Sequence, residues 1–132
     1  MYLIDTNIWL ELLLEQEKGE EVRRFFQSVE ARLLSISDFS LYSIGIILTK
    51  LKKYDVFIDF ISDTIEDSGV MRICLNPIDL KQVIQVQQRY QLDFDDSYQY
   101  IAAEKNNYVI VSFDSDFDRT LLGRKTPREV LL

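Results

Sequence analysis

Aspartate residues stand at the ends of apolar segments that lie far apart in this chain. Asp5 directly follows the apolar residues 1–4, and Asp114 directly follows residues 108–113. Residues 93–118 hold seven acidic side chains and one basic one, which is nearly the whole net charge of −7. Two carboxylates about 4 Å apart repel one another by about 4 kcal/mol at an effective dielectric constant of about 20, so such a cluster needs protons or a hard cation. Mg²⁺ and Mn²⁺ prefer oxygen ligands, and an ion held by aspartates commonly activates water for phosphodiester hydrolysis.

Several other kinds of catalysis are excluded because the residues they need are absent. The chain has no histidine, which excludes Ser-His-Asp and Cys-His catalysis and histidine metal ligands. The single cysteine, Cys74, excludes an internal disulfide and a cysteine-rich zinc site. None of the four glycines belongs to a glycine-rich phosphate-binding motif. Carboxylates, hydroxyls, lysines and arginines are left to do the chemistry.

The composition is that of a single globular domain covering residues 1–132, with 47% hydrophobic and 28% charged residues. An acidic chain does not bind nucleic acid through its overall charge, so contact with RNA or DNA requires a local basic patch or a bound metal. No apolar run is long enough to cross a membrane, and the first residues lack the basic segment of a signal peptide. We therefore expect a cytoplasmic protein with no membrane partner.

Short apolar segments alternate with amphipathic ones along the chain. Strands are predicted over residues 1–4, 33–36, 70–75 and 108–113. Helices are predicted over residues 8–17, 20–31, 37–53, 55–67, 76–90 and 93–106. A loop or single turn follows over 114–118, and then a polar, basic tail. This alternation predicts a three-layer α/β/α fold whose central, mostly parallel sheet has four or five strands.

In such a fold, the aspartates meet at one edge of the sheet. Sites of open parallel sheets lie beyond the carboxyl ends of the strands, where Asp5 and Asp114 are placed. The helix over 93–106 leads into the last strand, so its start, with Asp93, Asp95 and Asp96, lies at the same edge. Each aspartate also has an ordinary structural explanation as a helix cap, a first-turn acid or part of a solvated loop. Their convergence favours the metal site.

Three ordered motifs resemble those of PIN-domain ribonucleases of the VapC-like toxin type. They are Leu3-Ile4-Asp5-Thr6-Asn7, Leu92-Asp93-Phe94-Asp95-Asp96-Ser97 continuing to Ala102-Ala103, and Ile110-Val111-Ser112-Phe113-Asp114-Ser115-Asp116-Phe117. The resemblance covers essentially the whole chain. It implies a PIN-like fold and a metal-dependent endoribonuclease that cleaves RNA by in-line attack of water. It further implies the toxin of a toxin–antitoxin pair, which binds a small antitoxin protein and forms a homodimer.

The resemblance also assigns roles to individual residues. Asp5, Asp96 and Asp114 match the catalytic acids that hold Mg²⁺ or Mn²⁺, and Asp116 is a further candidate ligand. Asn7 and Ser112 would support these acids through hydrogen bonds, and Asp93 would be an accessory acid.

Ser43 is a departure from the family pattern, because it stands where the family usually has a glutamate. Asp38 lies too early and is expected to cap its helix, so Asp116 is the better candidate to replace the lost charge. The departure keeps a second reading open, in which the chain is a catalytically impaired PIN-like binding or regulatory module. A phosphoacceptor domain is a more distant alternative, and the late-strand lysine that it requires is missing.

The last residues carry the basic side chains that an acidic ribonuclease would need. Arg119, Arg124 and Lys125 are expected to hold RNA phosphates beside the metal. The alternative is a solvated tail that balances the neighbouring acids. Apolar residues between 39 and 57 exceed what one core-facing stripe requires, and this surplus would suit a dimer or an antitoxin.

Overall fold

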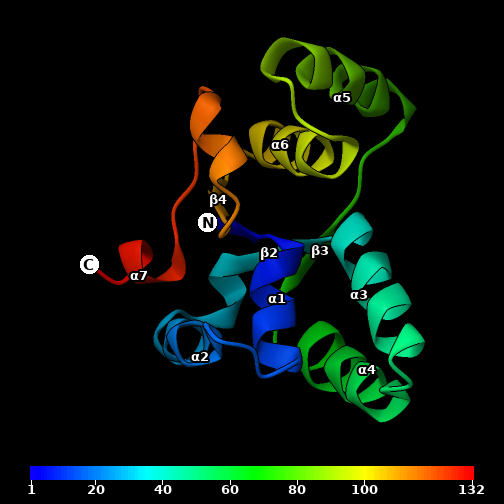
Figure 1. The fold of residues 1–132 in the computed structure, drawn as a ribbon, viewed down its shortest axis with the longest axis vertical. Helices are drawn as coiled ribbons and strands as arrows, with labels where there is room; N and C mark the ends of the chain where they lie inside the picture. The colour runs from blue at the N-terminus through cyan, green and yellow to red at the C-terminus, as the bar shows by residue number, and fades with distance from the viewer.

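The computed structural model describes residues 1–132 and has a central four-stranded sheet (Figure 1). The sheet has the order β3-β2-β1-β4, and every neighbouring pair is parallel. The strands are β1 (Tyr2–Ile4), β2 (Leu34–Ser37), β3 (Met71–Ile73) and β4 (Val109–Val111). Helices cover both faces, which confirms the predicted three-layer α/β/α architecture.

Four helices pack on one face of the sheet and two on the other (Figure 1). The first face carries α1 (Thr6–Leu13), α2 (Gly19–Ser28), α3 (Asp38–Lys50) and α4 (Tyr54–Phe60). The second face carries α5 (Pro77–Tyr90) and α6 (Phe94–Asn106), and a short α7 (Pro127–Val130) contacts α2. None of these helices has the length and apolar character needed to cross a lipid bilayer.

Alternate residues of the central strands point into two separate cores. Leu3 pairs in register with Ile110, and both pack against α5 and α6. Ile4 pairs with Val111, and both pack against α1–α4. The residues of β1 and β4 are apolar, as is typical of parallel strands that are covered on both faces. The other two strands, β2 and β3, also carry the polar residues Ser35 and Arg72. Asp5 directly follows β1, and its N–H donates to the carbonyl of Val111 at 3.0 Å.

The last residues are folded onto the protein, so the alternative of a solvated tail is wrong. Lys125 donates its N–H to the carbonyl of Ile110 at 2.8 Å and accepts the N–H of Ser112 at 3.0 Å. This single parallel bridge extends the sheet beyond β4, and Thr126 then caps α7 with its side chain. Sequence patterns missed the bridge because its hydrogen bonds are made by the backbone, which any residue supplies.

Some predicted boundaries also differ from the structure. The helix predicted over 20–31 ends at Ser28, because Val29 has an extended backbone. The helix predicted over 55–67 continues after Phe60 as a wider π turn over Ile61–Glu66. A 3₁₀ turn, Ser115–Arg119, occupies the predicted loop after β4.

An ion pair joins the two helices of the second face. The ammonium of Lys105 on α6 lies 2.7 Å from Oδ2 of Asp79, which also accepts the N–H of Asn76 in a capping box at the start of α5. The hydrogen bond from Lys105 and the one from Asn76 lower the pKa of Asp79 below its usual 3.8.

Replacing Asp79 by asparagine should destabilise the protein in a pH-dependent way. A carboxyl whose pKa is lowered by folding contributes stability above its unfolded pKa, and this contribution disappears as the pH falls through the folded value. The Tm of Asp79→Asn should therefore lie below that of the wild type at about pH 7, and the difference should close below about pH 4. Asp59→Asn, on the exposed side of α4, is the control. An equal difference at both pH values would contradict this assignment.

Candidate metal centre

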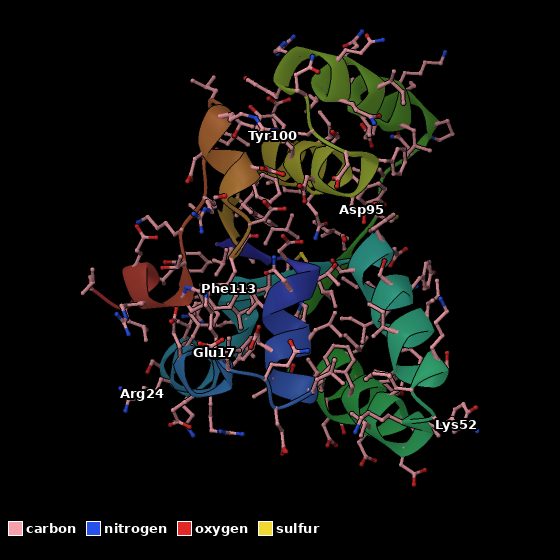
Figure 2. The ribbon with its side chains drawn as sticks, in the orientation of Figure 1. Glu17, Arg24, Lys52, Asp95, Tyr100 and Phe113 are labelled. Atoms are coloured by element: carbon pink, nitrogen blue, oxygen red, sulfur yellow. The ribbon has the colours of Figure 1, made fainter.

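A cavity of about 420 Å³ opens beyond the carboxyl ends of β1 and β4, between α1, α3 and α6. Five aspartates line it, and Ser43 and three apolar residues form the rest of its wall together with Thr6 and Asn7. The aspartates are Asp5, Asp93, Asp95, Asp96 and Asp114, and the apolar residues are Leu10, Ile46 and Ile47. Asp95 lies at the start of α6, on the side that faces α3 (Figure 2). The structure therefore brings together acids from all three predicted segments.

Local backbone requirements place three of these acids. Asp5 is the N-cap of α1 and accepts the N–H of Thr6 at 2.8 Å. Asp93 is the N-cap of α6 and accepts the N–H of Asp96 at 3.2 Å. Asp114 is the N-cap of the 3₁₀ turn and accepts the N–H of Asp116 at 2.8 Å. The capping explanation and the site explanation therefore both hold, because a strand end at this edge is also a helix start.

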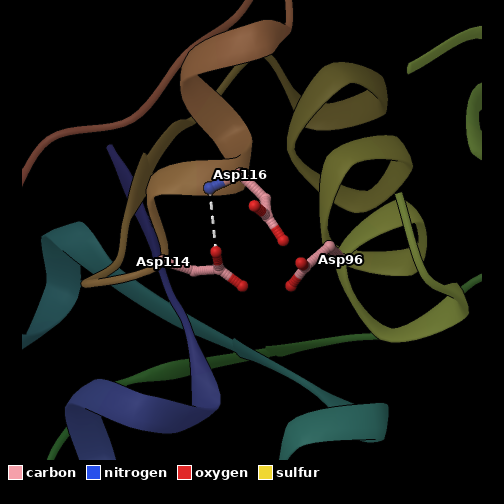
Figure 3. Close-up of side chains that lie close together, drawn as sticks. All are labelled: Asp96, Asp114 and Asp116. Carbon is pink, nitrogen blue, oxygen red and sulfur yellow. Dashed lines mark hydrogen bonds between the residues drawn. The ribbon is translucent and has the colours of Figure 1, made fainter. Parts of the chain in front are cut away.

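Three carboxylates point toward a common point (Figure 3). One oxygen from each of Asp96, Asp114 and Asp116 lies within 4.8 Å of the others. Asp96 comes from α6, whereas Asp114 and Asp116 come from the turn after β4. Asp5 lines the same cavity but is not a member of this group.

Burial and mutual repulsion disfavour the charged forms of these acids. Asp96 is 6% exposed, and its Oδ2 has no hydrogen-bond partner. Burial, followed by the close approach of Asp114 and the charges of Asp5 and Asp93, raises the pKa of Asp96 to about 9. Burial also raises the pKa of Asp5, although hydrogen bonds from Gln99, Ser112 and Thr6 oppose this effect.

These residues fit a hard divalent cation. Oδ2 of Asp96 is buried and accepts no hydrogen bond, so it can still accept a ligand bond. It belongs to a carboxylate that lies close to those of Asp114 and Asp116. Oxygen ligands of this kind suit Mg²⁺ or Mn²⁺, and the positive charge would favour the charged form of Asp96, which burial and the neighbouring acids disfavour.

Asn7 and Ser112 link Asp5 to the end of β4. The hydroxyl of Ser112 donates to Oδ2 of Asp5 at 2.6 Å and accepts the N–H of Asp114 at 2.9 Å. The amide of Asn7 donates to Ser112 Oγ at 3.2 Å, and its oxygen accepts the N–H of Phe113 at 3.2 Å. Two of the predicted acids are thus held by one hydroxyl.

The side chain of Ser43 lines the cavity, so no carboxylate reaches it from this turn of α3. Asp38 does not line the cavity and pairs instead with Arg72. The expectation that Asp38 caps its helix is wrong, because Ser37 is the N-cap of α3 and accepts the N–H of Ser40 at 3.1 Å.

Two of the three predicted RNA-binding side chains are engaged within the protein. Arg119 pairs with Asp116 at 2.9 Å and donates to the carbonyls of Tyr90 and Gln91. Arg124 pairs with Asp118 at 3.1 Å and donates to the carbonyl of Ser112. Lys125 has an exposed side chain.

Sequence reasoning missed Gln99. This side chain is 1% exposed, and its amide donates to Oδ1 of Asp5 at 3.0 Å and to the hydroxyl of Ser40 at 2.7 Å. Its position could have been noticed, because residues three apart share one face of a helix and Asp96 precedes it by that spacing.

This chain is similar in sequence or in fold to known proteins. A family model described as PIN domain matches residues 2–121. A toxin–antitoxin complex from Klebsiella pneumoniae is 19% identical, with a TM-score of 0.78 over 96% of this chain and 98% of that chain. Mycobacterium tuberculosis VapC20, described as a sarcin-ricin loop cleaving toxin, is 15% identical, with a TM-score of 0.77 over 89% of this chain and 93% of that chain.

A third similar structure, FitAcB from Neisseria gonorrhoeae, is 18% identical, with a TM-score of 0.76 over 97% of this chain and 99% of that chain. At such low identities, these similarities show a shared fold. No curated protein sequence matches this chain significantly.

Replacing Asp96 by asparagine should stabilise the metal-free protein. An acid whose pKa rises on folding, here from 3.8 to about 9, makes the folded state less stable as the pH rises through that interval. In the presence of EDTA, the Tm of Asp96→Asn should therefore exceed that of the wild type increasingly from about pH 4 to about pH 9. Mn²⁺ at about pH 8 should raise the Tm of the wild type and not that of the variant.

Asp63→Asn, an exposed change on the π turn, controls for the loss of one negative charge. If the two aspartate variants showed the same pH profile, the burial of Asp96 would not be the cause.

Proposed function

Because the chain belongs to the PIN domain family, we propose that it is a metal-dependent endoribonuclease and the toxin of a toxin–antitoxin pair. The observation that carries this proposal is the convergence of Asp96, Asp114 and Asp116 around an unpartnered, buried carboxylate oxygen. Repulsion between these carboxylates raises the free energy of the empty site. A bound cation would lower that free energy, because it offsets the repulsion. Mg²⁺ or Mn²⁺ is the proposed cofactor.

The proposed chemistry divides between the ion and the protein. A divalent cation at this site would stabilise the charge that develops on the scissile phosphate and assist ionisation of the attacking water. Asp96, Asp114 and Asp116 would hold the ion, and Asp5 would add a further negative charge from the end of β1. Ser112 and Asn7 orient Asp5 through the hydrogen bonds described above. Asp93 fixes the start of α6, and with it the position of Asp96.

The partners are part of the same proposal. The similar structures include a toxin–antitoxin complex and a toxin described as cleaving the sarcin-ricin loop, which supports an RNA substrate and a small antitoxin. Residues of α3, its C-cap and α4 leave large apolar side chains exposed, which supports a homodimer or an antitoxin contact in a cytoplasmic protein. These side chains are Tyr42, Ile46, Leu51, Tyr54 and Ile58.

A second candidate function is an ion-binding PIN-like module with impaired catalysis. Ser43 favours it, because the α3 wall of the cavity contributes a hydroxyl and apolar side chains where a carboxylate would add charge. A cleavage assay with Mn²⁺ and a chelator control separates the two candidates, since only the first predicts cut RNA.

Asparagine at Asp5 or Asp114 should reduce RNA cleavage to the level measured with excess EDTA. Each change removes a negative charge from the cavity but keeps a side chain of the same size, so the fold should survive. Cleavage of a labelled RNA pool with Mn²⁺, checked by the circular dichroism of each variant, tests this expectation. Asp67→Asn, an exposed change after the π turn, should cleave as the wild type does. Full activity in both cavity variants would refute the proposed site.

Lys125 should contribute to RNA binding more than Arg124. The arginine is committed to Asp118 and the carbonyl of Ser112, whereas the lysine side chain is exposed beside β4. Lys125→Gln should weaken binding of several RNA sequences to a similar extent and reduce the slope of log K against log salt by about 1. Arg124→Gln should mainly lower the Tm. Fluorescence anisotropy in Ca²⁺, across a salt series, measures the slopes, and an unchanged slope for Lys125→Gln would exclude its phosphate contact.

A further inference from the structure

A buried chain of hydrogen bonds lies behind Asp5 and joins β1, β2, α3 and α6. Gln99 on α6 is at its centre, and its amide donates to Oδ1 of Asp5 at 3.0 Å and to Oγ of Ser40 at 2.7 Å. The hydroxyl of Ser37, at the end of β2, donates to Oε1 of Gln99 at 2.7 Å. Ser40 continues the chain to Oγ1 of Thr6 at 2.8 Å. Gln99, Ser37 and Ser40 are each at most 1% exposed.

The chemistry of these groups fixes the orientation of the amide. A carboxylate that binds a cation only accepts hydrogen bonds, and the NH₂ group of Gln99 faces Oδ1 of Asp5 at 3.0 Å. Its carbonyl oxygen then faces Ser37, whose hydroxyl has one proton and places it on that oxygen. Both amide protons and the amide oxygen are therefore used, and Ser37 sets the amide orientation without touching Asp5.

The two oxygens of Asp5 are held unequally. Oδ1 accepts the N–H of Thr6 at 2.8 Å and the amide of Gln99 at 3.0 Å. Oδ2 accepts the hydroxyl of Ser112 at 2.6 Å and only a long contact from Asn7 at 3.5 Å. Two good donors occupy Oδ1, so Oδ2 is the oxygen with acceptor capacity to spare.

Among these donors, Gln99 alone comes from α6, the helix that carries Asp96. Thr6 and Asn7 belong to α1, and Ser112 follows β4. Gln99 therefore fixes the carboxylate of Asp5 relative to the carboxylate of Asp96, which lies one helical turn earlier on the same helix.

We propose that Gln99 is a positioning residue for ion binding, which occupies Oδ1 of Asp5 so that Oδ2 is available to the cavity, with Ser37 orienting its amide. This inference rests on the proposed function, because it concerns the ion that the acids hold. Second-layer partners of metal-binding carboxylates fix the orientation of the ligand and tune its affinity for the ion.

A structural role alone does not account for the contact with Asp5. An apolar side chain at position 99 would leave the buried hydroxyls of Ser37 and Ser40 without this partner and so lower stability. Neighbouring buried positions of α6 are Ile101, Ala102 and Ala103, so the helix tolerates apolar residues at this depth. What an apolar residue at position 99 cannot supply is the donor to Asp5. Ion affinity, measured separately from stability, therefore distinguishes the two roles.

The test measures Mn²⁺ affinity directly, by electron paramagnetic resonance of the free ion, in the full chain at constant pH. Gln99→Leu keeps the volume and removes the donor, and it should bind Mn²⁺ about 10- to 100-fold more weakly than the wild type. Ser37→Ala should produce a smaller loss in the same direction. The double variant should bind like Gln99→Leu alone, because the two residues act on Asp5 through one amide.

Tyr100→Phe is the matched control. Tyr100 is 1% exposed, follows Gln99 on the same helix, and packs 5.5 Å from Tyr90 of α5. It lies on the side of α6 away from Asp95 (Figure 2). This change also removes a buried polar atom from α6, so it should lower the Tm without changing the Mn²⁺ affinity.

The outcomes separate this inference from the proposed function. One outcome would overturn the role of Gln99 and leave the metal site intact. In it, Gln99→Leu binds Mn²⁺ within about twofold of the wild type, while Asp114→Asn loses binding. If Gln99→Leu does not fold, Ser37→Ala decides in the same way, with Ser40→Ala measured beside it, because the Ser37 hydroxyl also lies 3.3 Å from Oγ of Ser40. Unchanged Mn²⁺ affinity in Ser37→Ala would then overturn the role of the amide. A wild-type protein that binds no Mn²⁺ would overturn both.

Discussion

Asp5, Asp96 and Asp114 bring like charges into one cavity, and two of these side chains are almost fully buried there. Hydrogen bonds to the backbone hold these residues in place, so they cannot move apart. Asp5 is paired to Val111 through its N–H, and Asp114 is fixed through Ser112. Because relaxation is blocked, the repulsion can be relieved only by protons or by a cation. Protonation of Asp96 and binding of a cation thus both relieve the same repulsion between carboxylates.

Much of this arrangement follows from local sequence. Asp5 directly follows the apolar strand β1, and an aspartate at a strand end can also start the next helix, so the alternation of elements predicted the shared edge correctly. The order of layers and the parallel sheet were confirmed for the same reason. The bridge at Lys125, the pairing of Asp38 with Arg72 and the contact of Gln99 with Asp5 were not predictable in this way. They join residues distant in sequence, and a local pattern contains no information about which distant partner a side chain meets.

Two arginines reduce the excess of negative charge in the turn after β4. Arg119 pairs with Asp116, a member of the candidate metal cluster, and Arg124 pairs with Asp118 on the same turn. Both ion pairs reduce the repulsion between the acids around the cavity. The arginines that would attract a polyanion are therefore partly used to stabilise the turn that carries Asp114. If the chain is the proposed ribonuclease, an approaching phosphate would gain its attraction mainly from the ion and from exposed cations such as Lys125.

Ser43 changes how the remaining acids must work. The wall formed by α3 offers a hydroxyl and the side chains of Ile46 and Ile47, so all the negative charge of the cavity comes from β1, α6 and the turn after β4. With fewer carboxylates available, an error in the orientation of any one of them costs a larger share of the ion's coordination energy. The network of Ser37, Ser40 and Gln99 connects α3 to Asp5 from behind. In this protein, α3 therefore contributes to the site by orienting a carboxylate instead of supplying one.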